Sequence, residues 1–518
     1  MSVQVLDEKT QIVGSKFWIT LTVVSAAIMA LLDISIVNVA LNDIRAGFGT
    51  PLDQIAWVST GYMMANICII PLTGWFQKRF GFKRYFATSL IIFTVASALC
   101  GLSWNLGSLV IFRILQGLGG GAIIPTSQAI LFSRYPKKEH GMANAFFALG
   151  AITAPLLGPT VGGYLIEWLN WHWIFFINVP IGVIAVGLVL KHIDEPEFKA
   201  ELAPVDWTGL ALLATGMVSL QYVFEEGSRE GWWDATHITA LAVVAGVCLI
   251  TFVVHELETS HPVVDLRIFR NTSYLAASGL NFLMGTALFA GNLLFSLYCG
   301  NVMHYSALEI GTLMLQGSCI QIFIMPLVGR FGSKYDARVL IAFGIVLMSY
   351  SLWLNAHLTT EANRATMILP LFTRAIGMGF MFIPLSMTAL SDLPQKIRGN
   401  ATGLFVLTRE LGGSIGTAWM SNALIVHTAQ YVNALSEHVT PYNAATQSQM
   451  LMMQGVGRMT DRPETTSLTL LNMRINGQAM ISSFNIGFMT LCGVFILALS
   501  LLVFLKRQGK GAAAPAGH

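Results

Sequence analysis

A single aspartate lies deep inside an otherwise apolar run near the start of the chain. Asp33 stands in ALLDISIVNVAL, and Asn38, with Ser35 and Asn42, forms a separate polar strip on the same predicted helix. An ionised carboxylate near the centre of a bilayer costs about 2.5–3.5 kcal/mol on insertion scales. Low dielectric favours the protonated form of a carboxyl group, as a proton carrier requires. We therefore expect Asp33 to bind a proton or a cationic substrate, or else to anchor buried hydrogen bonds as a structural residue.

A second polar set follows helical spacing further along the chain. Arg113, Gln116, Gly117 and Gly120 stand at positions i, i+3, i+4 and i+7, so they share one helix face. Arginine does not deprotonate in proteins. Arg113 can therefore pair with a carboxylate or tune it, or it can extend its charge to the membrane surface as a snorkelling side chain.

Two more charges interrupt apolar segments in the second half of the chain. Glu410 follows Arg409 in TRELGGSIGTA, beside the small residues Gly412 and Gly416. It is a second candidate proton site, or a residue near a helix start that simply faces water. Arg374 is a further buried-charge candidate, and the sequence names no partner for it.

Composition identifies the elements that must hold these charges. Of 518 residues, 54% are hydrophobic and 11% are charged, against about 25% charged in soluble domains, and the mean hydropathy is +0.64. The solvent of this chain must be lipid, which makes it an all-α membrane protein. The net charge of +3 gives no indication of nucleic-acid binding.

The sequence gives no reason to expect an enzyme or a cofactor. Its six cysteines are scattered through apolar segments without a CxxC pair, so we interpret them as core residues rather than as disulfides or metal ligands. We find no nucleophile–base or metal-ligand constellation and no GxxxxGK[ST] loop, which argues against ATP as the driving energy.

Hydropathy predicts fourteen membrane-spanning helices of about 20 residues each. They fall near 17–40, 54–76, 84–104, 107–132, 142–167, 173–192, 207–225, 236–257, 272–299, 307–328, 338–357, 366–391, 400–426 and 479–505. Basic residues gather in alternate loops, for example at 78–84, 134–138 and 330–338. The positive-inside rule then places both termini in the cytoplasm.

The chain also repeats itself, which defines its domains. Pro71 matches Pro326 and Gly74 matches Gly329, in each case 255 positions on, and IIPTSQAIL at 123–131 is echoed by FIPLSMTAL at 382–390. Two parallel six-helix halves around a central cavity are the arrangement of alternating-access transporters. We predict a 6+2+6 organisation: an N-terminus at 1–16, halves at 17–195 and 271–505, a two-helix insertion at 196–270 and a disordered cytoplasmic tail at 506–518.

Two further segments stand out. The outer loop at 427–478 is polar, and it is either a flexible insertion or a docking surface for an extracytoplasmic partner. The run GAITAPLLGPTVGG has small residues at every fourth position, which gives a smooth helix face for close packing, and prolines that bend a helix. Its residues are Gly150, Ala154, Pro155, Gly158, Pro159 and Gly162. Such a helix suits halves that rock against each other, although small-residue packing is common in any membrane bundle.

These motifs resemble those of the major facilitator superfamily, specifically its fourteen-helix drug:proton antiporters of the EmrB/QacA type. LDISIVNVALN resembles the first-helix motif, RILQGLGGG the fourth-helix motif, GAITAPLLGPTVGG the antiporter motif and WHWIFFINVPIG the sixth-helix signature. GWFQKRFGFKR resembles the cytoplasmic loop motif, whose residues here are Gly74, Arg79, Gly81, Lys83 and Arg84. The chain departs from the family pattern at Lys78, where an aspartate is usual, and at Asn42, where a proline is usual.

The resemblance implies proton-coupled export of amphipathic toxic compounds, with the proton gradient as the energy source and no cofactor. It also implies a bacterial inner membrane, and an assembly with a periplasmic adaptor and an outer-membrane channel. Two alternatives stay open: a dedicated exporter of one metabolite, such as a siderophore, an antibiotic or a fatty acid, and a non-transporting membrane sensor.

Overall fold

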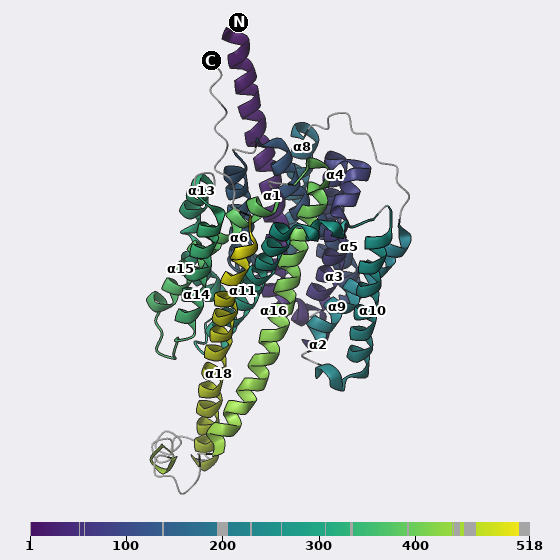
Figure 1. The fold of residues 1–518 in the computed structure, drawn as a ribbon. Coiled ribbons are helices and arrows are strands. Elements are labelled where there is room, and N and C mark those ends of the chain that lie inside the picture. The colour runs from purple at the N-terminus through teal and green to yellow at the C-terminus, as the bar shows by residue number, and fades with distance from the viewer. Residues whose placement is uncertain are drawn as a thin grey trace.

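A computed structural model describes residues 2–506 apart from positions 51, 56, 137–138, 194–205, 228–229, 261, 306, 332–334, 391–392, 438, 440–445 and 450–462. The expected tail at 506–518 lies outside the described residues, except for Lys506. The described chain is all-helical (Figure 1). Its long helices are α1 (Ser2–Phe48), α3 (Trp57–Phe80), α4 (Phe82–Gly101), α5 (Leu106–Arg134), α6 (His140–Trp168), α8 (Asn178–His192), α9 (Trp207–Glu226), α10 (Thr236–Glu258), α11 (Thr272–Asn301), α14 (Ala337–Asn355), α15 (Arg364–Leu390), α16 (Gln395–Glu437) and α18 (Pro463–Ala498).

The fourteen predicted spans all coincide with helices. Counting described residues only, eleven helical segments are long and apolar enough to cross a bilayer, and α3, α6 and α16 occupy the other three predicted positions. The sixth span is divided into the short α7 (Trp173–Phe176) and α8, and the tenth into α12 (Ala307–Ser318) and α13 (Gln321–Phe331). The last span ends in a 3₁₀ segment, η4 (Leu499–Phe504). Helix α1 begins at Ser2, so residues 2–16 of the expected N-terminal segment are helical.

Local sequence fixes several helix ends. Asn105 caps α5, because its side chain accepts a hydrogen bond from Ser108 N at 2.7 Å while the Ser108 hydroxyl accepts one from Asn105 N. Asp206 caps α9 through Gly209 N at 2.8 Å. Gly81 separates α3 from α4 with a φ of 83°, a left-handed conformation that favours glycine.

The repeated glycines lie where the two halves touch, at the end of the bundle that carries the basic loops. A Cβ on Gly74 of α3 would lie 2.5 Å from the backbone of Asn400 in α16. Its repeat partner Gly329 of α13 meets α6 in the same way, since a Cβ on Gly141 would lie 2.5 Å from the Gly329 carbonyl oxygen. Two equivalent backbone contacts therefore close this end of the bundle.

The two-helix insertion packs on both halves. Helices α9 and α10 lie against each other at one side of the bundle (Figure 1), and α9 also contacts α3 and α16. Ser414 Oγ of α16 donates a hydrogen bond to Gln221 Oε1 of α9 at 2.9 Å. Trp232, in the turn after α9, donates from Nε1 to Asn422 Oδ1 of α16 at 3.1 Å. The insertion thus bridges one helix of each half.

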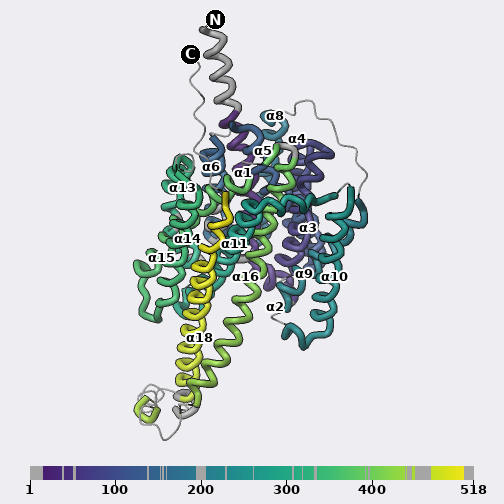
Figure 2. Tube along the Cα trace, viewed as in Figure 1, coloured from purple at the N-terminus to yellow at the C-terminus, as the bar shows by residue number. Residues whose placement is uncertain are grey.

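Two parts of the expected outer loop, 427–437 and 463–478, are helical. Helix α16 has 43 residues and α18 has 36, which gives lengths of about 65 and 54 Å at 1.5 Å per residue. A bilayer core is about 30 Å thick. Both helices run together beyond the rest of the bundle, at the end opposite the termini (Figure 2). Within the expected outer loop, residues 427–437 and 463–478 are therefore continuations of α16 and α18.

Candidate functional site

Asp33 is the centre of a buried polar cluster formed by α1, α5 and α8. Its side chain has no exposed surface. Oδ2 accepts a hydrogen bond from Arg113 Nη1 at 2.6 Å, and Oδ1 accepts from Gln116 Nε2 at 2.9 Å and from Asn178 Nδ2 at 2.7 Å. Each of these partners donates, so the arrangement is that of an ionised carboxylate.

The face of α1 that carries Asp33 is packed against the protein. The residues in question are at most 1% exposed: Thr22, Ala26, Met29, Ala30, Val37 and Ala40. Because these side chains fill the face, the carboxyl group meets protein donors rather than open space.

Arg113 is as buried as Asp33, with 1% of its side chain exposed. Its Nε donates to the Val58 carbonyl oxygen of α3 at 3.1 Å, and its guanidinium lies 4.3 Å from the centre of the Tyr62 ring. The snorkelling interpretation of Arg113 is therefore wrong. Gln116, one turn along α5, accepts from Arg113 Nη1 at 2.8 Å while it donates to Asp33, so it links the two charges.

Sequence reasoning missed Asn178 and Ser97. Asn178 Nδ2 donates both to Asp33 and, at 3.1 Å, to Ser97 Oγ of α4, whose hydroxyl donates to the Phe175 carbonyl oxygen at 2.9 Å. The available signal was an asparagine inside the apolar run FFINVPIG. A buried amide in such a run needs hydrogen-bond partners, but only the fold shows that one partner is Asp33.

Protonation of the Asp33 carboxylate would break its ion pair with Arg113. While Asp33 is ionised, it neutralises Arg113 and holds α1, α5 and α8 together. Protonation of the carboxyl group would leave Arg113 charged and unpaired in a dry environment, a state that costs several kcal/mol unless the surroundings rearrange. Protonation of Asp33 would therefore disturb the packing of the helices that meet there.

The other predicted charges lie apart from this cluster. Glu410 pairs with Arg409 at 3.3 Å, and 16% of its side chain is exposed. Because α16 already begins at Gln395, Glu410 lies about four turns into the helix, and the prediction that it lies near a helix start is wrong. Arg374 is buried in α15. The side chain of Asn38 lies outside the described residues.

Helix α6, which carries the antiporter-like run, packs along α1 beside the Asp33 cluster. A Cβ on Gly150 would lie 2.8 Å from Val24 Cγ1, and one on Gly162 would lie 3.3 Å from Ile36 Cγ2. Gly158 meets Ser35 so closely that a Cβ there would overlap the Ser35 side chain, and Ala154 has no exposed surface. The side chains of Pro155 and Pro159 lie outside the described residues, although the helix continues through both positions.

The residues of the loop motif surround the junction of α3 and α4. Gly74 makes the contact between the halves, and Gly81 forms the turn. The Arg79 guanidinium lies 5.8 Å from the Trp75 ring. Lys83 is half-buried and Arg84 is exposed at the start of α4. This motif lies on a different part of the molecule from the Asp33 cluster.

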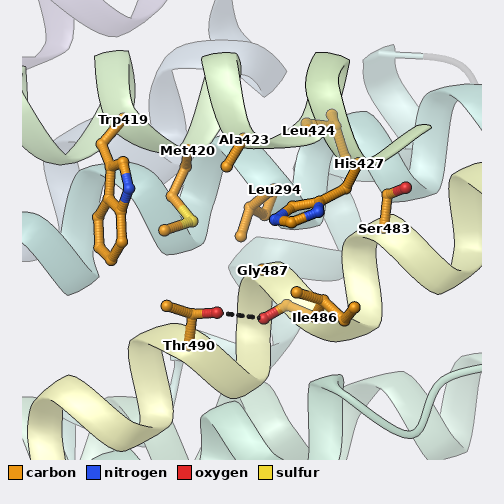
Figure 3. Close-up of a pocket in the computed structure, with 10 residues that line it drawn as sticks. All are labelled: Leu294, Trp419, Met420, Ala423, Leu424, His427, Ser483, Ile486, Gly487 and Thr490. Carbon is orange, nitrogen blue, oxygen red and sulfur yellow. Dashed lines mark hydrogen bonds between the residues drawn. The ribbon is translucent and has the colours of Figure 1, made fainter. Parts of the chain in front are cut away.

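A separate cavity lies between α11, α16 and α18 (Figure 3). Its volume is about 60 Å³, whereas sites for drug-sized ligands occupy roughly 300–1,000 Å³. Its walls include Trp419, Met420 and His427 from α16 and Ser483 and Thr490 from α18. In this conformation the cavity is too small for an amphipathic compound of that size.

Among the described residues, helices occupy all fourteen predicted spans, with an internal repeat and a carboxylate–arginine pair buried in one half, as in a multi-pass membrane transporter. The chain matches the model of the Major Facilitator Superfamily over residues 23–417, and it belongs to that superfamily. It is 34% identical to the multidrug export protein EmrB of Haemophilus influenzae, over 95% of this chain and 96% of that protein. It is 32% identical to the fatty acid resistance protein FarB of Neisseria gonorrhoeae, over 94% and 96% of the two chains.

Solved structures of the superfamily share the fold. The proton:xylose symporter XylE superposes with a TM-score of 0.57 at 14% identity, covering 93% of this chain and 95% of that chain. The human transporter MFSD10 gives a TM-score of 0.60 at 12% identity, covering 94% and 99%. These similarities support the fold assignment alone.

Proposed function

We infer that this protein is a proton-coupled antiporter that exports amphipathic toxic compounds. The observation that carries this inference is the buried Asp33–Arg113 pair on α1 and α5, with the antiporter-like helix α6 packed along α1 at Gly158. A protonatable group next to a close-packed, glycine-lined interface can convert proton binding into movement of one helix against another. Relatives named for multidrug export, among them EmrB of H. influenzae, support the substrate class.

In this mechanism Asp33 takes a proton from the outer side and releases Arg113. Loss of the Asp33–Arg113 ion pair loosens the contact between α1 and α6. The halves then rock, and the proton leaves on the cytoplasmic side as substrate binds. The membrane potential supplies about 2.3 kcal/mol per charge per 100 mV, which sustains roughly a fifty-fold gradient for one net charge per cycle. The proton gradient is the energy source, and we propose no cofactor and no catalytic activity.

We propose that the protein resides in a bacterial inner membrane with both termini in the cytoplasm. The basic loops then face inward, as the positive-inside rule requires, and the long hairpin of α16 and α18 projects outward. Export of a single metabolite is the second candidate function. The FarB relative is named for fatty acid resistance, which supports this second candidate function.

Transport by purified protein in proteoliposomes tests the proposed function. With an imposed proton gradient, we expect accumulation of several structurally unrelated amphipathic dyes, and proton movement in the opposite direction when a dye is added. A pH-sensitive probe on the side of the membrane that receives the protons measures their movement. Accumulation of only one compound from a broad panel would favour the dedicated exporter, and no flux with any compound would favour the non-transporting sensor.

We further propose that the hairpin docks a periplasmic adaptor, which in turn reaches an outer-membrane channel. The outer parts at 427–437 of α16 and 463–478 of α18 are about 16 and 24 Å long at 1.5 Å per residue. The outer part of α18 exposes apolar side chains, with Leu468 56% and Met473 64% exposed. We assign the adaptor contact to this exposed part of the hairpin.

Charge placed on the hairpin should separate assembly from transport. We expect Leu468→Glu with Met473→Glu to reduce co-purification of the adaptor, and resistance of cells to toxic compounds, by about tenfold or more, because apolar anchors dominate such interfaces. Transport in proteoliposomes should stay unchanged. Gln478→Glu adds charge at an exposed polar position of the same helix and serves as the control. Unchanged co-purification in the double variant would contradict docking on this surface.

A further inference from the structure

Arg374 is a buried arginine in the second half of the protein that the Asp33 mechanism does not use. It lies ten positions after the start of α15, or about 15 Å along the helix, and only 7% of the residue is exposed. The outer face of α15 carries Leu369, which is 50% exposed. Arg374 is on the opposite face, and its charge therefore points toward the protein interior rather than toward lipid headgroups.

The face of α15 around Arg374 is apolar and rich in methionine. Its members recur at helical spacing and are at most 2% exposed: Met367, Leu371, Met378 and Met381. In this conformation Met381 packs against Gly344 of α14, and Leu371 packs against Gly317 of α12. Helix α15 also packs against α6 of the first half, so this face belongs to a helix that borders the moving interface.

Arg374 differs from the other two buried arginines in having no counter-charge. Arg113 pairs with Asp33 at 2.6 Å, and Arg409 pairs with Glu410 at 3.3 Å. Among the residues that the structure describes, no carboxylate pairs with Arg374, and its guanidinium donates no hydrogen bond. An arginine stays charged at any relevant pH, and a buried charge without a partner is strongly unfavourable. Among the described residues, Arg374 is therefore a buried positive charge without a counter-charge.

We propose that Arg374 binds the anionic head of exported amphipathic compounds, carboxylates or sulfonates. A guanidinium forms two parallel charge-assisted hydrogen bonds with such a group, which both orients and neutralises it. The missing counter-charge is then supplied by the substrate. This assignment rests on the proposed export function and narrows its substrate class to compounds that include organic anions.

Binding measurements on the full chain test the assignment without a proton gradient. The protein is placed in nanodiscs of phosphatidylcholine, which contribute no anionic headgroup, and titrated with 2-naphthoate and with neutral 2-naphthamide of nearly the same shape. We expect the wild-type protein to prefer the carboxylate by about tenfold or more, as for charge-assisted hydrogen bonds. Arg374→Met should abolish that preference, and Arg374→Lys should retain part of it.

Thermal unfolding distinguishes a ligand site from a structural role. Arg374→Met should raise the melting temperature of the ligand-free protein, because it removes an uncompensated buried charge, and 2-naphthoate should stabilise the wild type but not this variant. Arg364→Met, at the exposed end of the same helix, should leave the preference for the carboxylate intact. A lower melting temperature for Arg374→Met, or an undiminished preference for 2-naphthoate, would overturn the assignment.

The outcomes also separate this inference from the proposed function. A preference for the carboxylate that depends on Arg374, found in a protein that moves no compound in proteoliposomes, would reject export and keep the anion site. Proton-coupled transport together with a preference that survives Arg374→Met would reject the anion site and keep export.

Discussion

Asp33→Asn is expected to abolish substrate-driven proton movement in proteoliposomes. Asparagine cannot carry a proton through the cycle, so dye flux should no longer be coupled to the proton gradient. The same change leaves Arg113 buried without its counter-charge, and breaking a buried pair in this way costs about 3–5 kcal/mol. We therefore also expect a clearly lower melting temperature in thermal unfolding, measured on the purified protein in the same lipids.

A neutral double variant separates these two effects. Asp33→Asn with Arg113→Gln removes both charges, and replacing a buried pair by neutral groups is often close to neutral for stability. The double variant should regain most of the lost stability while coupled flux stays absent. Recovery of coupled transport together with stability would show that Asp33 is only a structural anchor.

Gly158→Ala should reduce coupled efflux by about tenfold or more, because its new methyl group would overlap Ser35 at the contact between α6 and α1. Gly163→Ala is the matched control on the same helix, since a Cβ there meets nothing within 4 Å. Initial rates of dye efflux at equal protein content give the comparison. Equal rates for the two variants would mean that close packing of α6 on α1 does not limit transport.

The sequence predicted the membrane spans well because hydropathy is a local property. Breaks within spans were harder: α12 ends at Ser318 and α13 begins at Gln321, inside a single predicted span. Helix α16 begins at Gln395, within a polar stretch that hydropathy treats as a loop. The outer ends of α16 and α18 were missed for the same reason, because a helix can continue into water once neighbouring helices support it.

The candidate site was predicted in part. Asp33, Arg113 and Gln116 were each singled out by polarity in an apolar run, and helical spacing placed the last two on one face. Their convergence was not predicted, because Asp33 and Arg113 are 80 positions apart in the sequence. Asn178 was missed because its signal was one amide in an apolar run. A pairing between distant helices depends on packing, which no local pattern encodes.

The paired glycine contacts at the basic-loop end have a consequence for leakage. Gly74 against Asn400 and Gly329 against Gly141 are equivalent under the internal repeat, one between α3 and α16 and the other between α13 and α6. Both are backbone contacts with no long side chain that could stretch to keep them partly made. Breaking one of these contacts would tilt the halves and strain the other contact, so we expect both to break together. When both contacts break in one cooperative step, partly open conformations are rarely populated. Passive leakage of protons across the membrane is thereby limited.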